Sequence, residues 1–190
     1  MKRILTFTGL LFVLNLAASG CCSVVAKSGD AKILRCPQIF IHERGTESFR
    51  LELPTVSLAQ TGTHILRVRD MPPYLVGKFS FGLSMLVPYG EGVLYQKNPV
   101  WGDARIAVVF RKLDGNETFR QSFVLGTSPH GFTQARDGWM VGWNLGAGPY
   151  SMDPVPMTNQ PFDIVVDVEK PSRRLSDQIS LTGFAYVHTP

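Results

Sequence analysis

The alternation of apolar and small side chains along residues 78–87 constrains the fold of this chain more than any other feature. Apolar residues occupy every second position from Phe79 to Val87, with serine or glycine at most positions between them. Successive side chains of a β strand point to opposite faces of the sheet, whereas a helix repeats about every 3.6 residues. The segment therefore predicts a strand with one buried face, and Phe81 is expected on that face.

Eight further segments have the same alternation, or a short apolar run that is typical of a buried strand. They comprise residues 33–42, 49–53, 64–69, 104–111, 118–125, 138–145, 161–168 and 179–187. No segment has helix periodicity over three turns, and 13 prolines interrupt most candidates. The sequence thus predicts an all-β domain over residues 32–190, an antiparallel β-sandwich of about eight or nine strands, with a β-barrel as the alternative.

A tight turn is predicted between the segments 104–111 and 118–125. Asp114 and Gly115 stand between these two apolar runs. The Asp-Gly dipeptide favours the positive φ angles of short hairpin turns. We therefore expect a β-hairpin whose tip also includes Asn116.

The first 20 residues have the organisation of a signal peptide. Lys2 and Arg3 are basic, and an apolar stretch with few interruptions follows from residue 4 to residue 18. A helix of that length would span about 22 Å, which is short of the roughly 30 Å hydrocarbon core of a bilayer. A cleaved signal peptide over residues 1–20 is therefore expected, rather than a membrane-spanning helix.

The end of this segment resembles the lipobox of bacterial lipoproteins, which consists of an aliphatic residue, two small residues and a modified cysteine. Ala17, Ala18, Ser19 and Gly20 precede Cys21, and Ala18 stands where leucine is usual. The resemblance implies that Cys21 carries a diacylglycerol group and fatty acyl chains such as palmitate, which would anchor the mature protein in a membrane. The alternative is ordinary secretory cleavage after residues 24–26, which would leave no lipid.

The residue after the modified cysteine sorts many enterobacterial lipoproteins, and aspartate at that position retains them at the inner membrane. Cys22 occupies the position here, so the resemblance implies a lipid-anchored protein of the outer membrane that faces the periplasm. Residues 21–31 are expected to be the lipidated N-terminus and a short tether, because the side chains from Ser23 to Ala31 are small or polar and have no period.

Cys22 and Cys36 form an even pair if Cys21 carries the lipid, and exported proteins fold in an oxidising compartment. A disulfide between them would close a loop of about 15 residues. In the alternative, Cys22 stays free or is modified and Cys36 packs as a small apolar residue. Both alternatives remain open at the level of sequence.

The charge of the chain does not favour a polyanionic partner. The formal net charge is +4, and Lys2 and Arg3 of the signal peptide supply two of these charges. No run of five or six like charges occurs. We therefore expect no binding of nucleic acid.

No combination of residues has the spacing of an established catalytic or metal site. No Gly-x-Ser-x-Gly motif occurs, and neither Cys22 nor Cys36 has a nearby group that would activate a thiolate. The four histidines, at positions 42, 64, 130 and 188, lack any paired spacing. We expect neither a metal nor a cofactor, and no enzymatic activity.

Three carboxylates, Asp163, Asp167 and Glu169, could share one face of the strand at 161–168 and bind calcium. The preferred interpretation is the solvent-facing side of an edge strand. An envelope enzyme would instead need a deep pocket that joins His130 with Asp137 or with these carboxylates.

Aromatic residues and glycines are concentrated between residues 137 and 150. This segment contains Trp139, Trp143 and Tyr150 together with four glycines. Exposed aromatic side chains beside flexible glycines are suited to a ligand or partner surface. Equally, both tryptophans could fill the core while the glycines permit tight turns. The three aromatic residues are the candidate binding surface.

The arrangement as a whole resembles small proteobacterial β-sandwich lipoproteins of unknown function. The resemblance lies in the lipobox, the strand-rich body and the closing segment Pro-Phe-Asp-Ile-Val-Val-Asp-Val at 161–168, and it implies no site residues. The leading hypothesis is a lipid-anchored, non-catalytic binding or structural module, with an envelope protein as a candidate partner. The alternatives are a periplasmic immunity protein that neutralises a toxic effector, and an envelope hydrolase.

Overall fold

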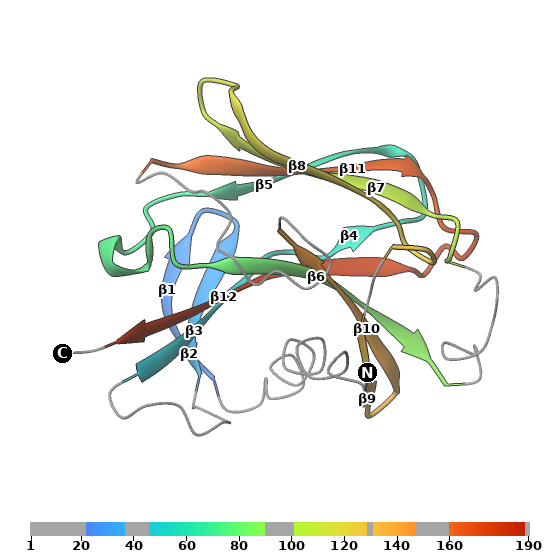
Figure 1. Ribbon diagram of the computed structural model, residues 1–190, viewed down its shortest axis with the longest axis horizontal. Helices are drawn as coiled ribbons and strands as arrows, with labels where there is room; N and C mark the ends of the chain where they lie inside the picture. The colour runs from blue at the N-terminus through green and yellow to red at the C-terminus, as the bar shows by residue number, and fades with distance from the viewer. Residues whose placement is uncertain (1–21, 37–45, 90–100, 129–130, 147–159, 189–190) are drawn as a thin grey trace, which may run out of the picture.

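The computed structural model describes residues 22–36, 46–89, 101–128, 131–146 and 160–188. They form two antiparallel β-sheets packed face to face (Figure 1). The all-β class and the sandwich predicted from the sequence are therefore confirmed, and the presence of two separate sheets decides against a single closed sheet.

The larger sheet contains eight strands and has the order β1-β2-β3-β12-β6-β10-β9, with β4 paired to β12 beside this path. Their bounds are β1 (Ser23–Ser28), β2 (Ala31–Cys36), β3 (Thr46–Glu52), β4 (Val56–Ser57), β6 (Ser80–Pro88), β9 (Gly131–Ala135), β10 (Gly138–Leu145) and β12 (Gln178–His188). The last strand, β12, lies in the middle of this sheet between β3 and β6, whereas the first strand, β1, is at its edge.

The smaller sheet has the order β5-β11-β7-β8 and lies above the larger one in Figure 1. Its strands are β5 (Gly62–Val68), β7 (Arg105–Lys112), β8 (Glu117–Val124) and β11 (Phe162–Lys170). The predicted hairpin joins β7 to β8: Gly115 has a φ of 90°, and the Asn116 amide donates to Asp114 Oδ1 at 2.9 Å. Its tip projects beyond the sheet at the top of Figure 1.

The core lies between the two sheets and contains the side chains that the two-residue period predicted to be buried. Phe79, just before β6, and the four alternating residues of β6 up to Val87 are each at most 1% exposed. Phe81 meets Phe110 of β7 across the interface, with ring centroids 4.9 Å apart. Each fully buried large apolar side chain contributes about 1.5 to 3 kcal/mol, so these rows supply much of the stability of the sandwich.

The turn between β1 and β2 attaches one edge of the large sheet to the small sheet. The Asp30 amide donates to the Arg67 carbonyl at 2.8 Å, and the Arg67 amide donates to Asp30 Oδ2 at 2.8 Å. Gly29 makes this approach possible, because its φ is 65° and a Cβ there would lie 2.4 Å from the Arg67 oxygen. The turn thereby satisfies backbone groups on the outer edge of β5, which protects that edge from pairing with another chain.

Two expectations from the sequence need correction. Ser23–Ser28 was expected to be part of a tether, but these residues form β1, whose backbone pairs with β2. The described residues contain twelve strands rather than eight or nine, because β1, β4 and β9 were also not predicted. β4 has only two residues, and most side chains of β1 are exposed, so neither strand carries a two-residue apolar period.

Candidate functional site

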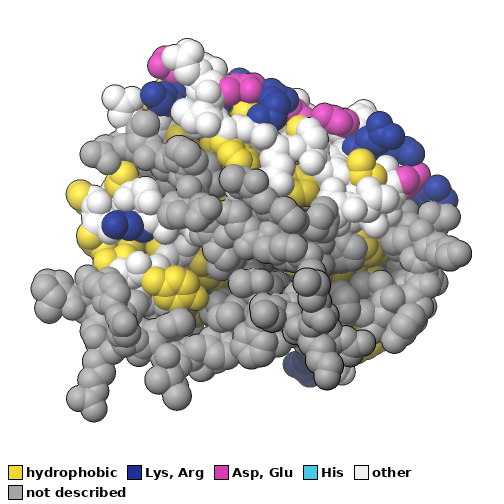
Figure 2. Space-filling view, viewed as in Figure 1, with side chains coloured by type: hydrophobic (Ala, Val, Ile, Leu, Met, Phe, Trp, Pro, Cys, Tyr) yellow, Lys and Arg dark blue, Asp and Glu magenta, His cyan; other side chains and the backbone are white. Residues whose placement is uncertain are grey.

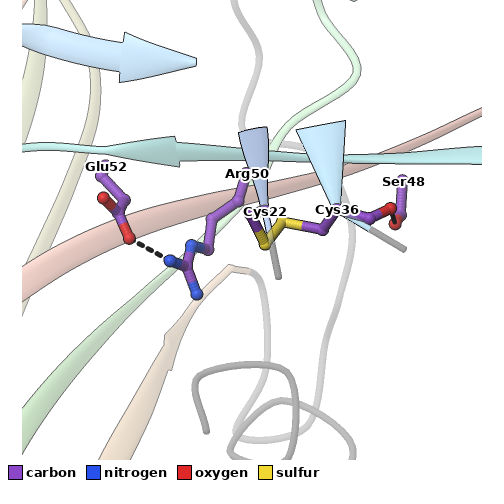
Figure 3. The surroundings of a disulfide bond; sticks show 5 residues. All are labelled: Cys22, Cys36, Ser48, Arg50 and Glu52. Atoms are coloured by element: carbon purple, nitrogen blue, oxygen red, sulfur yellow. Dashed lines mark hydrogen bonds and ion pairs between the residues drawn. A yellow bond between two sulfur atoms is a disulfide. The ribbon is translucent and has the colours of Figure 1, made fainter. Parts of the chain in front are cut away.

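A disulfide joins Cys22 to Cys36 at the open end of the β1–β2 hairpin (Figure 3). The strand register places the two residues opposite one another, because Ser23 pairs with Arg35. The disulfide was one of the two alternatives from the sequence, and it is the one that the structure contains. Cys21 lies outside the described residues.

Arg50 of β3 lies beside the disulfide on the outer face of the large sheet (Figure 3). It forms an ion pair with Glu52, and its side chain is only 3% exposed. Leu34 and Phe184 flank Arg50 across the strands, and both are more than nine-tenths buried. This part of the outer face is therefore packed, although it points away from the core between the sheets.

Over β12, β6 and β10 the outer face of the large sheet differs in charge from that of the small sheet, whereas β3 carries Arg50 and Glu52 on the same outer face. Along β12, β6 and β10 the outward-facing side chains are uncharged. They are Ser180, Thr182, Phe184, Tyr186, Ser80, Ser84, Leu86, Met140 and Asn144, with glycines between them. The small sheet instead presents a row in which Asp163 lies between Arg67 and Arg111. Figure 2 shows basic and acidic side chains alternating on this side of the molecule.

The three carboxylates Asp163, Asp167 and Glu169 were expected on the solvent-facing side of an edge strand, with a calcium site as the alternative. β11 is instead an inner strand of the small sheet, because it pairs with both β5 and β7. The three carboxylates also do not come together as one site. Asp163 forms an ion pair with Arg69 at 2.6 Å, and Asp167 Oδ1 accepts a hydrogen bond from Thr63 at 2.7 Å. Glu169 is exposed at an irregularity of the strand. Within the described residues, no group of three or more histidine, cysteine or acidic side chains is arranged to hold a metal.

Of the three aromatic residues in the candidate binding surface, Trp143 was assigned there wrongly. Its side chain is fully buried, packs edge-on against Trp101 at a centroid distance of 5.9 Å, and donates from Nε1 to the Leu125 carbonyl at 3.2 Å. It fills the core, in agreement with the alternative interpretation of the sequence. Tyr150 lies outside the described residues.

Trp139 is partly exposed and packs against Tyr89 near the end of β6. The two rings meet edge to face at 6.2 Å, Tyr89 is 47% exposed, and its hydroxyl donates to the Ala135 carbonyl. We refer to Tyr89 and Trp139 as the aromatic pair. Tyr89 was not among the residues expected at a binding surface, although it continues the two-residue period that runs from Phe79 to Val87.

A small hollow of about 110 Å³ lies where β5 ends and β11 begins. Arg69 lines it, but the guanidinium is already engaged with Asp163 and the Phe162 carbonyl. Pockets that enclose a small molecule usually have about 300 to 1,000 Å³, so this hollow could admit a single side chain of a partner at most. It does not contain Asp137, and His130 lies outside the described residues.

The remaining histidines do not form a site within the described side chains. His64 is half-buried on β5, while His42 and the side chain of His188 lie outside the described part. In the same part of the chain, no helix has the length and apolar character needed to cross a bilayer.

Comparisons with known proteins do not identify a family. No protein-family model matches the chain, and no curated protein sequence matches it. Among solved structures, the chain is similar to the carbohydrate-binding module CBM27-1 of Caldicellulosiruptor saccharolyticus in complex with mannohexaose, at 12% identity and a TM-score of 0.32 over 88% of this chain and 80% of that one.

A second similar structure is the arabinose-bound MgGH51 α-L-arabinofuranosidase. It has 11% identity and a TM-score of 0.26, and the match covers 88% of this chain and 23% of that one. At these values neither similarity assigns a ligand or an activity to this chain.

Proposed function

We propose that this chain is a lipid-anchored protein of the bacterial cell envelope, and that its β-sandwich is a non-catalytic binding or structural module. The observation that carries the proposal is the disulfide between Cys22 and Cys36. It leaves Cys21 as the odd cysteine of three, next to a signal-like segment and at the position that the lipobox resemblance selects. A structural disulfide also favours an extracytoplasmic location, where thiols are oxidised.

The aromatic pair is the best-supported binding surface of the proposed module. Tyr89 and Trp139 offer two adjacent, partly exposed rings that are held by neighbouring strands. Aromatic side chains give a large contact area for few frozen torsions, and such residues dominate the energetics of many interfaces. Trp143 cannot contribute directly, because it is buried.

Metabolic labelling with an alkyne analogue of palmitate tests the lipid anchor. We expect the wild-type chain to incorporate the label, and Cys21→Ser to lose it and to accumulate as uncleaved precursor. Cys22→Ser is the matched control, since it removes the neighbouring thiol but leaves Cys21 intact. Labelling that disappears in Cys22→Ser and persists in Cys21→Ser would contradict the assignment, as would a mature N-terminus at Lys27.

The binding surface is tested by capture of partners from intact envelopes with the lipidated protein as bait. Trp139→Ala should reduce the yield of a specific partner. Replacing a residue that dominates an interface with alanine typically weakens the binding free energy by about 2 kcal/mol or more, roughly thirtyfold in affinity. Leu113→Ala, at the exposed hairpin tip, is the control. A partner whose capture depends equally on both positions, or on neither, would exclude the aromatic pair as its binding site.

A further inference from the structure

The disulfide removes the flexible connection that the sequence predicted between the anchor and the domain. As an extended tether, residues 21–31 would let the domain move up to about 35 Å from the membrane. In the structure, Cys22 is bonded to Cys36, and β1 pairs with β2 from Ser23 onward. Consecutive Cα atoms lie about 3.8 Å apart, so a lipid on Cys21 would be only one residue away from the β1–β2 hairpin that the disulfide closes.

The register also determines which part of the domain would meet the membrane. Cys22 and Cys36 lie at the end of the β1–β2 hairpin opposite the Gly29–Asp30 turn. That turn contacts β5 of the small sheet through Arg67. The anchor point is therefore on the side of the molecule away from the small sheet.

Apolar side chains are exposed around this anchor point. Val24 and Val25 of β1 are 58% and 45% exposed, and Tyr186 of β12 is 39% exposed. Tyr186 is close to the disulfide, because Ser48 pairs with both Cys36 and Tyr186. Valine tolerates the apolar side of a lipid headgroup layer, and tyrosine is enriched there because its ring is apolar and its hydroxyl polar.

We propose that this surface, formed by Val24, Val25 and Tyr186 beside the disulfide, rests on the lipid surface of the membrane that holds the anchor. The large sheet then faces the bilayer, and the charged outer face of the small sheet faces water, where its alternating arginines and carboxylates are well solvated. The proposal depends on the lipid anchor at Cys21 proposed above. It adds that the domain is held against the membrane surface and does not extend away from it.

Photo-crosslinking tests the orientation without adding a thiol that could compete with the disulfide. Val24→p-benzoylphenylalanine and Tyr186→p-benzoylphenylalanine place the reactive group at the proposed surface. Leu113→p-benzoylphenylalanine is a matched control, because Leu113 is as exposed as Val24, at 58%, but lies at the hairpin tip of the small sheet. The lipidated proteins are irradiated in vesicles of phosphatidylethanolamine and phosphatidylglycerol, and adducts are identified by mass.

We expect phospholipid adducts at positions 24 and 186 and none at position 113. Adducts at all three positions in similar yield, or at position 113 alone, would overturn the orientation. A glycine–serine spacer of twelve residues between Cys21 and Cys22 gives a further check, since its mean span is about 20 Å. The spacer should reduce the adducts at position 186, and an undiminished yield would overturn the role assigned to the short connection.

The mass of the mature protein separates failure of this inference from failure of the lipid anchor. If no lipid is present, the lipid anchor of the proposed function is wrong. The same crosslinking variants are then given a histidine segment before Cys22, which attaches them to vesicles that contain a nickel-chelating lipid. Absence of adducts at positions 24 and 186 on these vesicles would overturn the surface assignment as well, whereas their presence would support it.

Discussion

Trp143 packs edge-on against Trp101, with ring centroids 5.9 Å apart and an interplanar angle of 82°, and neither side chain is more than 1% exposed. The two rings join β10 to the segment that leads into β7, so they connect the two sheets. Trp139 lies four residues earlier on the same side of β10, but it is partly exposed and contacts Tyr89. The two tryptophans of β10 therefore have different environments and different predicted roles.

Trp143→Ala is expected to lower the free energy of unfolding by about 3 to 5 kcal/mol, because it leaves a large cavity and removes the hydrogen bond to Leu125. Trp139→Ala should cost clearly less, since the ring is partly in water already. Urea denaturation of both variants, followed by circular dichroism, measures the difference. Equal losses in the two variants would place Trp139 in the core and remove it from the proposed binding surface.

The β7–β8 hairpin tip should accept an inserted flexible loop between Asp114 and Asn116 with little change in stability, because the tip is exposed and makes only local contacts. Phe81→Asp should prevent folding, since it buries an unpaired charge between the sheets. Leu113→Asp, at an exposed position, is the control for the added charge. Thermal melting tests all three variants, and a parental melting curve for Phe81→Asp would show that the inward face of β6 is misassigned.

Loss of the disulfide is expected to lower stability by up to about 3 kcal/mol, the value for a closed loop of roughly 15 residues. We expect this loss in the Cys22→Ser/Cys36→Ser double variant, in which β1 keeps its pairing with β2 and the hydrogen bonds of Ser28 to Arg69 but loses the covalent link at its other end. Reductant should destabilise the wild-type protein by the same amount in urea denaturation and leave the double variant unchanged. A reductant effect on the double variant would point to another cause.

Asp103 is expected to make stability depend on pH in acid. Hydrogen bonds from Lys170 and Arg173, at 2.8 and 3.0 Å, lower the pKa of its carboxyl from 3.8 to about 2. Because the folded-state pKa is the lower one, the ionised carboxylate stabilises the fold above about pH 4, and this contribution is lost as the pH falls towards 2. The carboxylate is about one-third exposed, so the contribution should not exceed roughly 1 kcal/mol.

Denaturation of Asp103→Asn between pH 7 and pH 2 tests this linkage. The variant should be less stable than the wild type at pH 7, and the difference should disappear near pH 2. Glu169→Gln, at the exposed end of β11, is expected to follow the wild-type profile more closely. A constant difference between Asp103→Asn and the wild type across the pH range would exclude the ion pairs as its cause.

The sequence alone determined those features that depend on local backbone geometry. The two-residue period identified the inward face of β6. The same period holds in the segment 64–69, where Leu66 and Val68 are buried and Ile65 between them is exposed. Asp-Gly located the β7–β8 turn for the same reason, since the conformational preference belongs to the dipeptide itself. All nine expected segments overlap strands of the structure.

The tertiary structure alone decided which strands are neighbours and how deeply each side chain is buried. β12 pairs with β3 and β6, and Arg69 pairs with Asp163, across long stretches of sequence that carry no local signal. Trp139 and Trp143 have the same parity on one strand, yet only Trp143 lies far enough inside the sandwich to be enclosed by both sheets. β1 has no two-residue apolar period, and most of its side chains are exposed. It is a strand because its backbone pairs with β2 and because the disulfide between Cys22 and Cys36 holds the start of the strand against the end of β2.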